Sequence, residues 1–84
     1  MNMSEAMDLA MYEAKCVAVP GIEAHRAPGR GTARYVWWNP DEGFMVRFQC
    51  GDLLLSEAFR RRILPVKEYR DSAKWFVVKI EGRR

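Results

Sequence analysis

Apolar residues recur every third or fourth position near the start of the chain, which is the repeat of an α-helix. These residues are Met3, Met7, Ala10, Met11 and Ala14. Ser4 stands before them as a candidate N-cap, and acidic residues fill the first turn, where the helix dipole favours negative charge. The pattern predicts a helix over Glu5–Ala14, with Pro20-Gly21 as a stop signal further on.

The middle of the chain changes to a two-residue alternation, which is the repeat of a β-strand. Ala33–Trp38 and Phe44–Cys50 are predicted strands, and Asn-Pro-Asp-Glu-Gly at 39–43 is a turn that joins them into a hairpin. On the second strand one face carries Phe44, Val46, Phe48 and Cys50, and the other carries Met45, Arg47 and Gln49. Cys16 and Cys50 both fall in predicted strands, where cysteine is most often a small buried apolar residue.

The remaining segments complete the predicted order of elements. They are a short strand at Cys16–Val19, a polar loop at 23–32, a turn at Gly51-Asp52, a helix at Glu57–Arg62 capped by Ser56 and ended by Pro65, an irregular or single-turn segment at Glu68–Lys74, and a strand at Trp75–Ile80. We therefore predict one α+β domain over residues 1–84. Its small antiparallel sheet, made of the central hairpin 33–50 plus the C-terminal strand, packs against the N-terminal helix, with a second short helix.

A chain of 84 residues buries only about 60% of the surface that its unfolded form exposes, so its stability is small unless something supplements it. Two distant cysteines make disulfides a poor supplement, and a homo-oligomer is the favoured one. The first fourteen residues carry acids and no early base, unlike a signal peptide, and no apolar run is long enough to span a bilayer. We therefore expect a cytoplasmic protein that does not enter membranes, in the host cytoplasm if a phage encodes it.

Candidate catalytic chemistry is sparse in the sequence. His25 is the single histidine and lies in the predicted polar loop, where an exposed, non-catalytic role is more common. No CxxC or HExxH motif and no cluster of carboxylates indicates a metal site. We therefore expect no enzymatic activity, no metal and no cofactor, and a function based on binding.

Aromatic and basic residues on the predicted hairpin are the main candidates for binding. Trp37 and Trp38 are adjacent on one strand, so their side chains must lie on opposite faces of the sheet. An exposed tryptophan near Arg34 or Arg47 can stack on a nucleobase or anchor a protein interface. Both alternatives imply binding.

Charge is distributed unevenly along the chain. Residues 1–55 carry five basic and seven acidic residues, whereas residues 56–84 carry nine basic and four acidic ones. Arg60 and Arg61, with Arg62, can bind phosphates, although a run of arginines at a helix C-terminus is more often only solvated. The basic C-terminal third can attract phosphates or an acidic partner, and it fits a solvated surface equally well.

The two ends of the chain resemble a family of small phage proteins, the second type of Thoeris anti-defence proteins. The C-terminal match consists of Pro65, Glu68, Ser72, Trp75, Val77 and Val78. The N-terminal match is a helix through Ala6-Met7 that runs into a strand at Val17 and then reaches Gly21. The family's usual tryptophan after this glycine is Ile22 here, and its usual arginine just before is Val19.

The resemblance implies a homo-oligomer that sequesters a cyclic nucleotide between subunits without reacting with it, with Trp75 as a pocket or interface residue. Our first hypothesis is therefore a phage-type counter-defence protein that removes a cyclic nucleotide immune signal, using Trp37 or Trp38, Trp75 and nearby arginines. The second is an anti-CRISPR-like inhibitor that docks on a host defence complex through the same residues. The third is a small nucleic-acid-binding module.

Overall fold

The computed structural model describes residues 1–80. The elements, in chain order, are α1 (Met3–Glu13), β1 (Cys16–Ala18), the 3₁₀ helix η1 (Ile22–Ala24), β2 (Arg26–Ala27), β3 (Gly31–Asn39), β4 (Gly43–Phe48), β5 (Gly51–Leu54), α2 (Leu55–Arg60), α3 (Val66–Asp71) and β6 (Phe76–Val78). The α+β class is confirmed.

α1 begins at a capping box. The Asn2 side chain accepts a hydrogen bond from the Glu5 backbone N–H at 2.8 Å, and the Glu5 carboxylate accepts one from the Asn2 backbone N–H at 2.9 Å. The prediction that Ser4 caps the helix was therefore wrong. A cap at Ser4 would place Met7 three residues on, and a methionine cannot return the second hydrogen bond.

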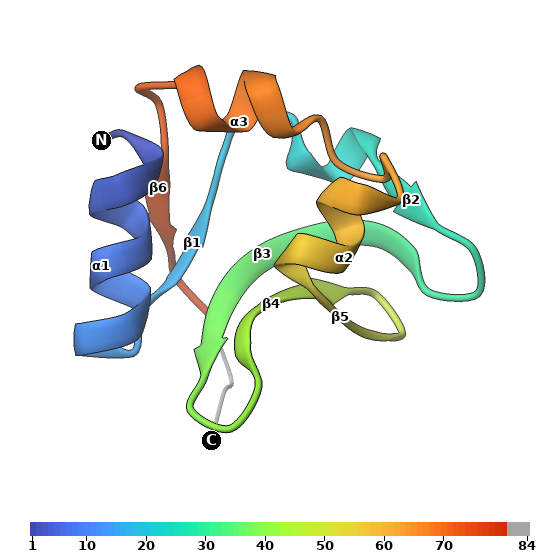
Figure 1. Ribbon diagram of the computed structural model, residues 1–84, viewed down its shortest axis with the longest axis horizontal. Coiled ribbons are helices and arrows are strands. Elements are labelled where there is room, and N and C mark those ends of the chain that lie inside the picture. The colour runs from blue at the N-terminus through green and yellow to red at the C-terminus, as the bar shows by residue number, and fades with distance from the viewer. Residues whose placement is uncertain (81–84) are drawn as a thin grey trace.

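The strands form one antiparallel sheet in the order β5-β4-β3-β1-β6, with β2 paired to the start of β3 (Figure 1). One row of paired positions crosses four of these strands and is buried throughout: Val17, Val36, Val46 and Leu53. Burying β-branched and leucine side chains in such a row is the main favourable term for the sheet. This row defines the core face of the sheet.

The predicted hairpin is confirmed as β3 and β4, joined through the turn before Gly43. The Asn39 side chain accepts a hydrogen bond from the Asp41 backbone N–H at 2.9 Å, which fixes the turn. Gly43 has a φ of 105°, a conformation that other residues rarely adopt. The expected alternation holds in part: Val46 and Phe48 are buried and Arg47 between them is partly exposed, but Met45 on the opposite face is buried as well.

The segment after the hairpin differs from the prediction. Gly51 and Asp52 do not turn the chain; they begin β5, in which Leu53 pairs with Val46, and the turn lies at 49–50 instead. α2 then starts at Leu55, directly after β5, and its N-terminus has no side-chain cap. Ser56 therefore lies inside the helix, because the burial of Leu53 and Leu55 sets the position of both elements.

Two further segments are more ordered than predicted. The segment from Val66 to Asp71 is a six-residue helix, α3, that follows Pro65, where an irregular or single-turn segment was predicted over Glu68–Lys74. The polar loop at 23–32 contains η1 and β2, and β2 pairs with β3. The final strand is shorter than predicted, with Phe76–Val78 paired to β1.

The two cysteines have different environments. Cys16 is buried in β1, as expected, whereas Cys50 is exposed. The prediction of a buried Cys50 was wrong because β4 ends at Phe48, so that Cys50 lies in the turn beyond the strand.

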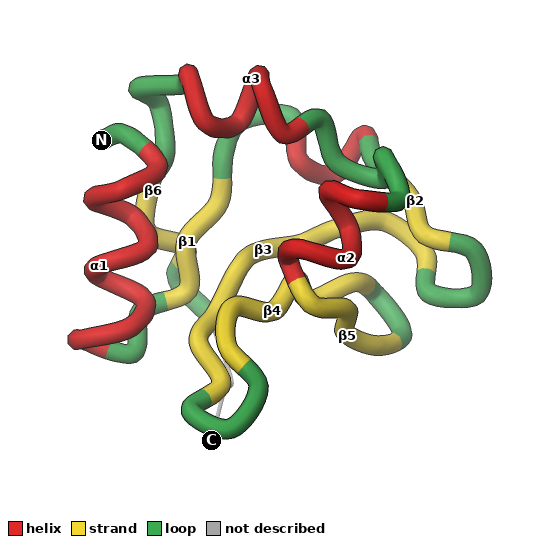
Figure 2. Tube along the Cα trace, viewed as in Figure 1, coloured by secondary structure: helices red, strands yellow, loops and turns green. Residues whose placement is uncertain are grey.

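The three α-helices lie around the core face of the sheet. α1 packs against β1 and β3 at one end of the molecule, α2 packs against β4 and β5 at the other, and α3 lies between them and contacts α1 (Figure 2). Ala6 and Ala10 of α1, Ala58 of α2 and Tyr69 of α3 all reach the same core cluster. This arrangement brings α2 and α3 together at a surface groove.

Candidate functional site

The structure gathers part of the predicted aromatic and basic cluster on the outer face of the sheet. The Arg47 guanidinium lies 5.7 Å from the centre of the Trp37 ring and 5.8 Å from that of Tyr35. Arg47 also donates hydrogen bonds to the Asp52 carboxylate and, at 3.3 Å, to the Tyr35 hydroxyl. The hydrogen bond to Asp52 is the largest cause of a raised pKa for Arg47. Because Asp52 already neutralises this guanidinium, the cluster is a poor phosphate site.

The other predicted hairpin residues do not join this cluster. Trp38 lies on the core side of β3 and packs edge-on against Phe44, with ring centres 4.8 Å apart. Arg34 is exposed. The two tryptophans thus separate to opposite faces, as the strand geometry requires.

Trp75 belongs to the core. Its side chain is 2% exposed, and its indole N–H donates a hydrogen bond to the Tyr69 backbone oxygen at 2.9 Å. The prediction that Trp75 contacts a ligand or partner is therefore corrected. Its side chain fills the space under α3 and anchors the chain between α3 and β6.

Arg60 and Arg61 are held by their own helix. Both guanidiniums contact the Glu57 carboxylate, Arg61 at 2.6 Å, and the hydrogen bond from Arg61 is the largest cause of the lowered pKa of Glu57. Arg60 and Arg61 therefore stabilise α2 locally as exposed i,i+3 and i,i+4 pairs. They do not form the phosphate clamp considered from the sequence.

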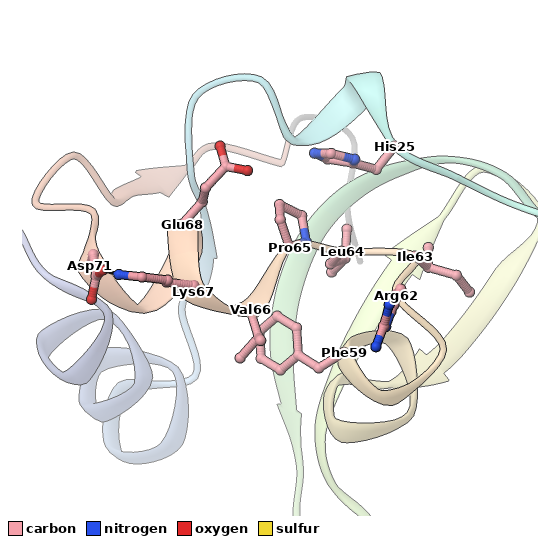
Figure 3. Close-up of a pocket in the computed structure, with 10 residues that line it drawn as sticks. All are labelled: His25, Phe59, Arg62, Ile63, Leu64, Pro65, Val66, Lys67, Glu68 and Asp71. Carbon is pink, nitrogen blue, oxygen red and sulfur yellow. Dashed lines mark hydrogen bonds and ion pairs between the residues drawn. The ribbon is translucent and has the colours of Figure 1, made fainter.

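A groove lies between α2 and α3 and is closed at one side by His25. Its volume is about 790 Å³, which lies within the usual range of ligand pockets. Four successive apolar residues form much of its surface: Ile63, Leu64, Pro65 and Val66. The rings of His25 and Phe59 provide flat surfaces on either side of this segment (Figure 3). We call this site the α2–α3 groove.

Charged side chains of both signs border the groove. Lys67 points toward Asp71 (Figure 3) and donates a hydrogen bond to it at 2.8 Å, and this bond is the largest cause of the lowered pKa of Asp71. Arg62 and Glu68, by contrast, form no ion pair within residues 1–80. These two side chains are available to a ligand.

Arg62 has an unusual backbone. Its φ is 60°, in the left-handed region, where a residue with a side chain is disfavoured and glycine is the usual choice. The position directly follows the C-terminal end of α2, and the conformation turns the chain toward Pro65. Residues with side chains that are held in such a conformation occur often at functional sites.

Tyr69 lies beneath the groove. Its ring packs edge-on against His25 at 5.9 Å and Phe59 at 6.3 Å, so it supports both aromatic walls. The Tyr69 side chain is 4% exposed, and its buried hydroxyl has no hydrogen-bond partner within the described residues. Burial, followed by the nearby Glu68 carboxylate, raises the pKa of this hydroxyl above its ordinary value.

Most of these groove residues were not identified from the sequence. His25 was considered only as an exposed loop residue, and Arg62 only as the end of an arginine run. Phe59 lies in the helix predicted over Glu57–Arg62 and Tyr69 in the segment at Glu68–Lys74, and neither was considered for binding. A groove formed by 59–71 and residue 25 depends on a tertiary contact, for which a single sequence gives no signal.

Other kinds of site find no support in the described part of the chain. Residues 1–80 contain no group of three or more His, Cys, Asp and Glu side chains that could hold a metal ion. Within the same range, the His25 imidazole makes no hydrogen bond to a hydroxyl, thiol or carboxylate. None of the helices described has the length and apolar content needed to cross a membrane.

Comparisons with protein-family models, curated proteins and solved structures find no match to this chain. The resemblance to the Thoeris anti-defence family therefore stays a prediction.

Proposed function

We propose that this protein is a non-enzymatic binding protein that sequesters a cyclic nucleotide in the α2–α3 groove. Its action would be to remove an immune signal of the host from solution, as a phage-type counter-defence protein. The observation that carries the proposal is the combination, in one groove, of aromatic rings with an arginine and a carboxylate that form no ion pair within residues 1–80.

Each part of a nucleotide has a matching group in the groove. The Phe59 and His25 rings offer faces for a base, and base–aromatic stacking contributes about 1–3 kcal/mol. Arg62 offers a guanidinium to a phosphate, and a hydrogen bond to a charged group contributes about 1.5–3 kcal/mol. Glu68 can accept hydrogen bonds from ribose hydroxyls. The apolar segment 63–66 adds buried apolar area. Together with the polar contacts, this burial is needed to reach a binding free energy of roughly −8 kcal/mol, which corresponds to a micromolar Kd.

The test is a thermal unfolding screen against 3′,5′-cyclic nucleotides, cyclic dinucleotides and cyclic ADP-ribose isomers. A ligand at 100 times its Kd stabilises the native state by about 2.7 kcal/mol. In a domain of this size that shift raises Tm by roughly 10 °C or more. The bound ligand should be recovered chemically unchanged.

Three variants assign the binding to the groove. Arg62→Gly should abolish the ligand-induced shift while raising the stability of the empty protein by about 1 kcal/mol, because glycine relieves the left-handed strain. Ala14→Gly, at the other non-glycine residue with positive φ, should give the same stabilisation and keep the ligand shift. Arg60→Ala, which removes a charge outside the groove, should also keep it.

Two results would refute the proposal: no Tm shift with any nucleotide, or a shift that survives Arg62→Gly. Ligand turnover would refute its non-enzymatic part.

Docking of a partner protein in the same groove is the second candidate function. The exposure of Val66, at 39%, and the carboxylates on the border favour it, because a protein surface supplies apolar groups and both signs of charge. Nucleic-acid binding gains less support. Arg47, Arg60 and Arg61 each contact a carboxylate, which leaves fewer cations for a phosphate backbone.

A further inference from the structure

Two carboxylates border the α2–α3 groove, and they differ in their partners. Asp71 accepts the hydrogen bond from Lys67, whereas Glu68 forms no ion pair within residues 1–80. A carboxylate without a cation repels the phosphate of a nucleotide unless the ligand itself donates hydrogen bonds to it. The chemistry of Glu68 therefore restricts which nucleotides the groove can hold.

The Glu68 carboxylate lies beside one aromatic wall of the groove. Glu68 and His25 lie on the same side of the segment 63–66 and point toward each other (Figure 3). Phe59 and Arg62 lie on the other side of this segment in the same view. A base that stacks on His25 thus presents its edge to Glu68, and the phosphate of the same ligand is left for Arg62.

Nucleobases differ in the hydrogen-bond donors that their edges offer. Guanine presents two adjacent donors, the N1–H and the exocyclic N2–H, which match the two oxygens of a carboxylate in a bidentate pair. Adenine and cytosine each present one amino group beside an acceptor nitrogen, and uracil presents one N–H between two carbonyl oxygens. In these three bases an acceptor would face a carboxylate oxygen and be repelled.

The ribose cannot replace the base in this role. A 3′,5′-cyclic nucleotide keeps only its 2′-hydroxyl free, and this hydroxyl donates a single hydrogen bond. It can therefore satisfy one oxygen of Glu68 and leaves the second oxygen without a donor. Guanine satisfies both.

We propose that the α2–α3 groove selects guanine nucleotides and that Glu68 is the residue that determines this specificity. The guanine stacks on His25 and donates its N1 and N2 hydrogens to the two Glu68 oxygens, while Arg62 binds the phosphate. This inference rests on the proposed function and adds to it the identity of the base.

Titration calorimetry with matched probes tests the selection. The pairs are 3′,5′-cyclic GMP against 3′,5′-cyclic AMP, and cyclic di-GMP against cyclic di-AMP. In each pair that binds, the guanine ligand should bind about 10- to 100-fold more tightly, which is the discrimination expected of one bidentate contact to a base. Cyclic IMP, which lacks the exocyclic N2 group, should bind with an affinity between those of cyclic GMP and cyclic AMP.

Two matched substitutions assign the preference to one side chain. Glu68→Gln replaces an acceptor oxygen with an amide donor, which repels the N–H groups of guanine and fits the donor and acceptor of adenine. It should lower the affinity for the guanine ligand by about tenfold or more and leave adenine binding unchanged or tighter. Glu13→Gln, the same change at an exposed position of α1, should keep the full guanine preference.

The outcomes separate this specificity from the proposed function. Equal affinities for guanine and adenine ligands, or a guanine preference that survives Glu68→Gln, would overturn the role of Glu68 and leave nucleotide sequestration standing. If Glu68→Gln changes only the Tm of the empty protein, the carboxylate serves the first turn of α3 and not the ligand. If no nucleotide binds, the proposed function fails, and the guanine selection fails with it.

Discussion

At the scale of single residues, the Tyr69 hydroxyl combines deep burial with the absence of a hydrogen-bond partner among the described residues. A buried, unsatisfied polar atom costs about 1–3 kcal/mol. The ring is retained because it supports His25, Phe59 and Trp75, all within 6.3 Å between ring centres. The oxygen contributes nothing to that packing.

Tyr69→Phe should therefore raise the free energy of unfolding by about 1 kcal/mol at neutral pH. The pH dependence has a definite sign. Burial raises the pKa of Tyr69 in the folded state, so the unfolded chain loses the proton first, and stability falls as pH rises above about 10. Tyr69→Phe should flatten this alkaline loss, measured by urea unfolding between pH 8 and 11. A variant that loses stability at pH 7, or keeps the full alkaline slope, would contradict the assignment.

The residue scale also shows where sequence reasoning stops. Strand alternation predicted that Trp37 and Trp38 separate, and they do, but which of them faces outward depends on the pairing of Val36 with Val17. Arg62 is marked by a backbone angle and Tyr69 by a tertiary contact, and neither feature is visible in the order of residues.

At the scale of elements, the hairpin could be predicted because its evidence is local: alternating residues and a turn sequence with proline and glycine. β5 and α2 could not, because Leu53, Leu54 and Leu55 form one apolar run that belongs partly to each element. The register with β4, in which Val46 pairs with Leu53, decides where the strand ends. The boundary between β5 and α2 therefore depends on pairing with the rest of the sheet and not on the local sequence.

The start of α1 allows a direct test of the corrected N-cap, which is Asn2 and not Ser4. Asn2→Ala removes the acceptor for the Glu5 backbone N–H and should lower the free energy of unfolding by about 1 kcal/mol. Ser4→Ala should change it by less than about 0.5 kcal/mol, because an exposed serine inside the first turn caps nothing. Chemical denaturation of both variants measures the difference. Equal losses, or a larger loss for Ser4→Ala, would restore Ser4 as the cap.

At the scale of the whole molecule, the first and last elements of the described chain are bonded to each other. The Trp75 backbone N–H donates a hydrogen bond to the Met1 oxygen at 2.9 Å, and β6 pairs with β1 next to α1. Stability therefore depends on contacts between the first and last elements. A domain of this length has a free energy of unfolding of roughly 4–13 kcal/mol in total, so losing these contacts would remove a substantial fraction of it.

The sequence-based expectation of a homo-oligomer can be tested through the melting temperature. If a dimer melts to unfolded monomers, a tenfold rise in protein concentration stabilises each chain by about 0.7 kcal/mol, half of the 1.4 kcal/mol per dimer, which corresponds to a rise in Tm of roughly 3–6 °C. Scanning calorimetry of the wild-type protein at several concentrations should show this rise. A Tm that does not change with concentration would contradict the expected oligomer.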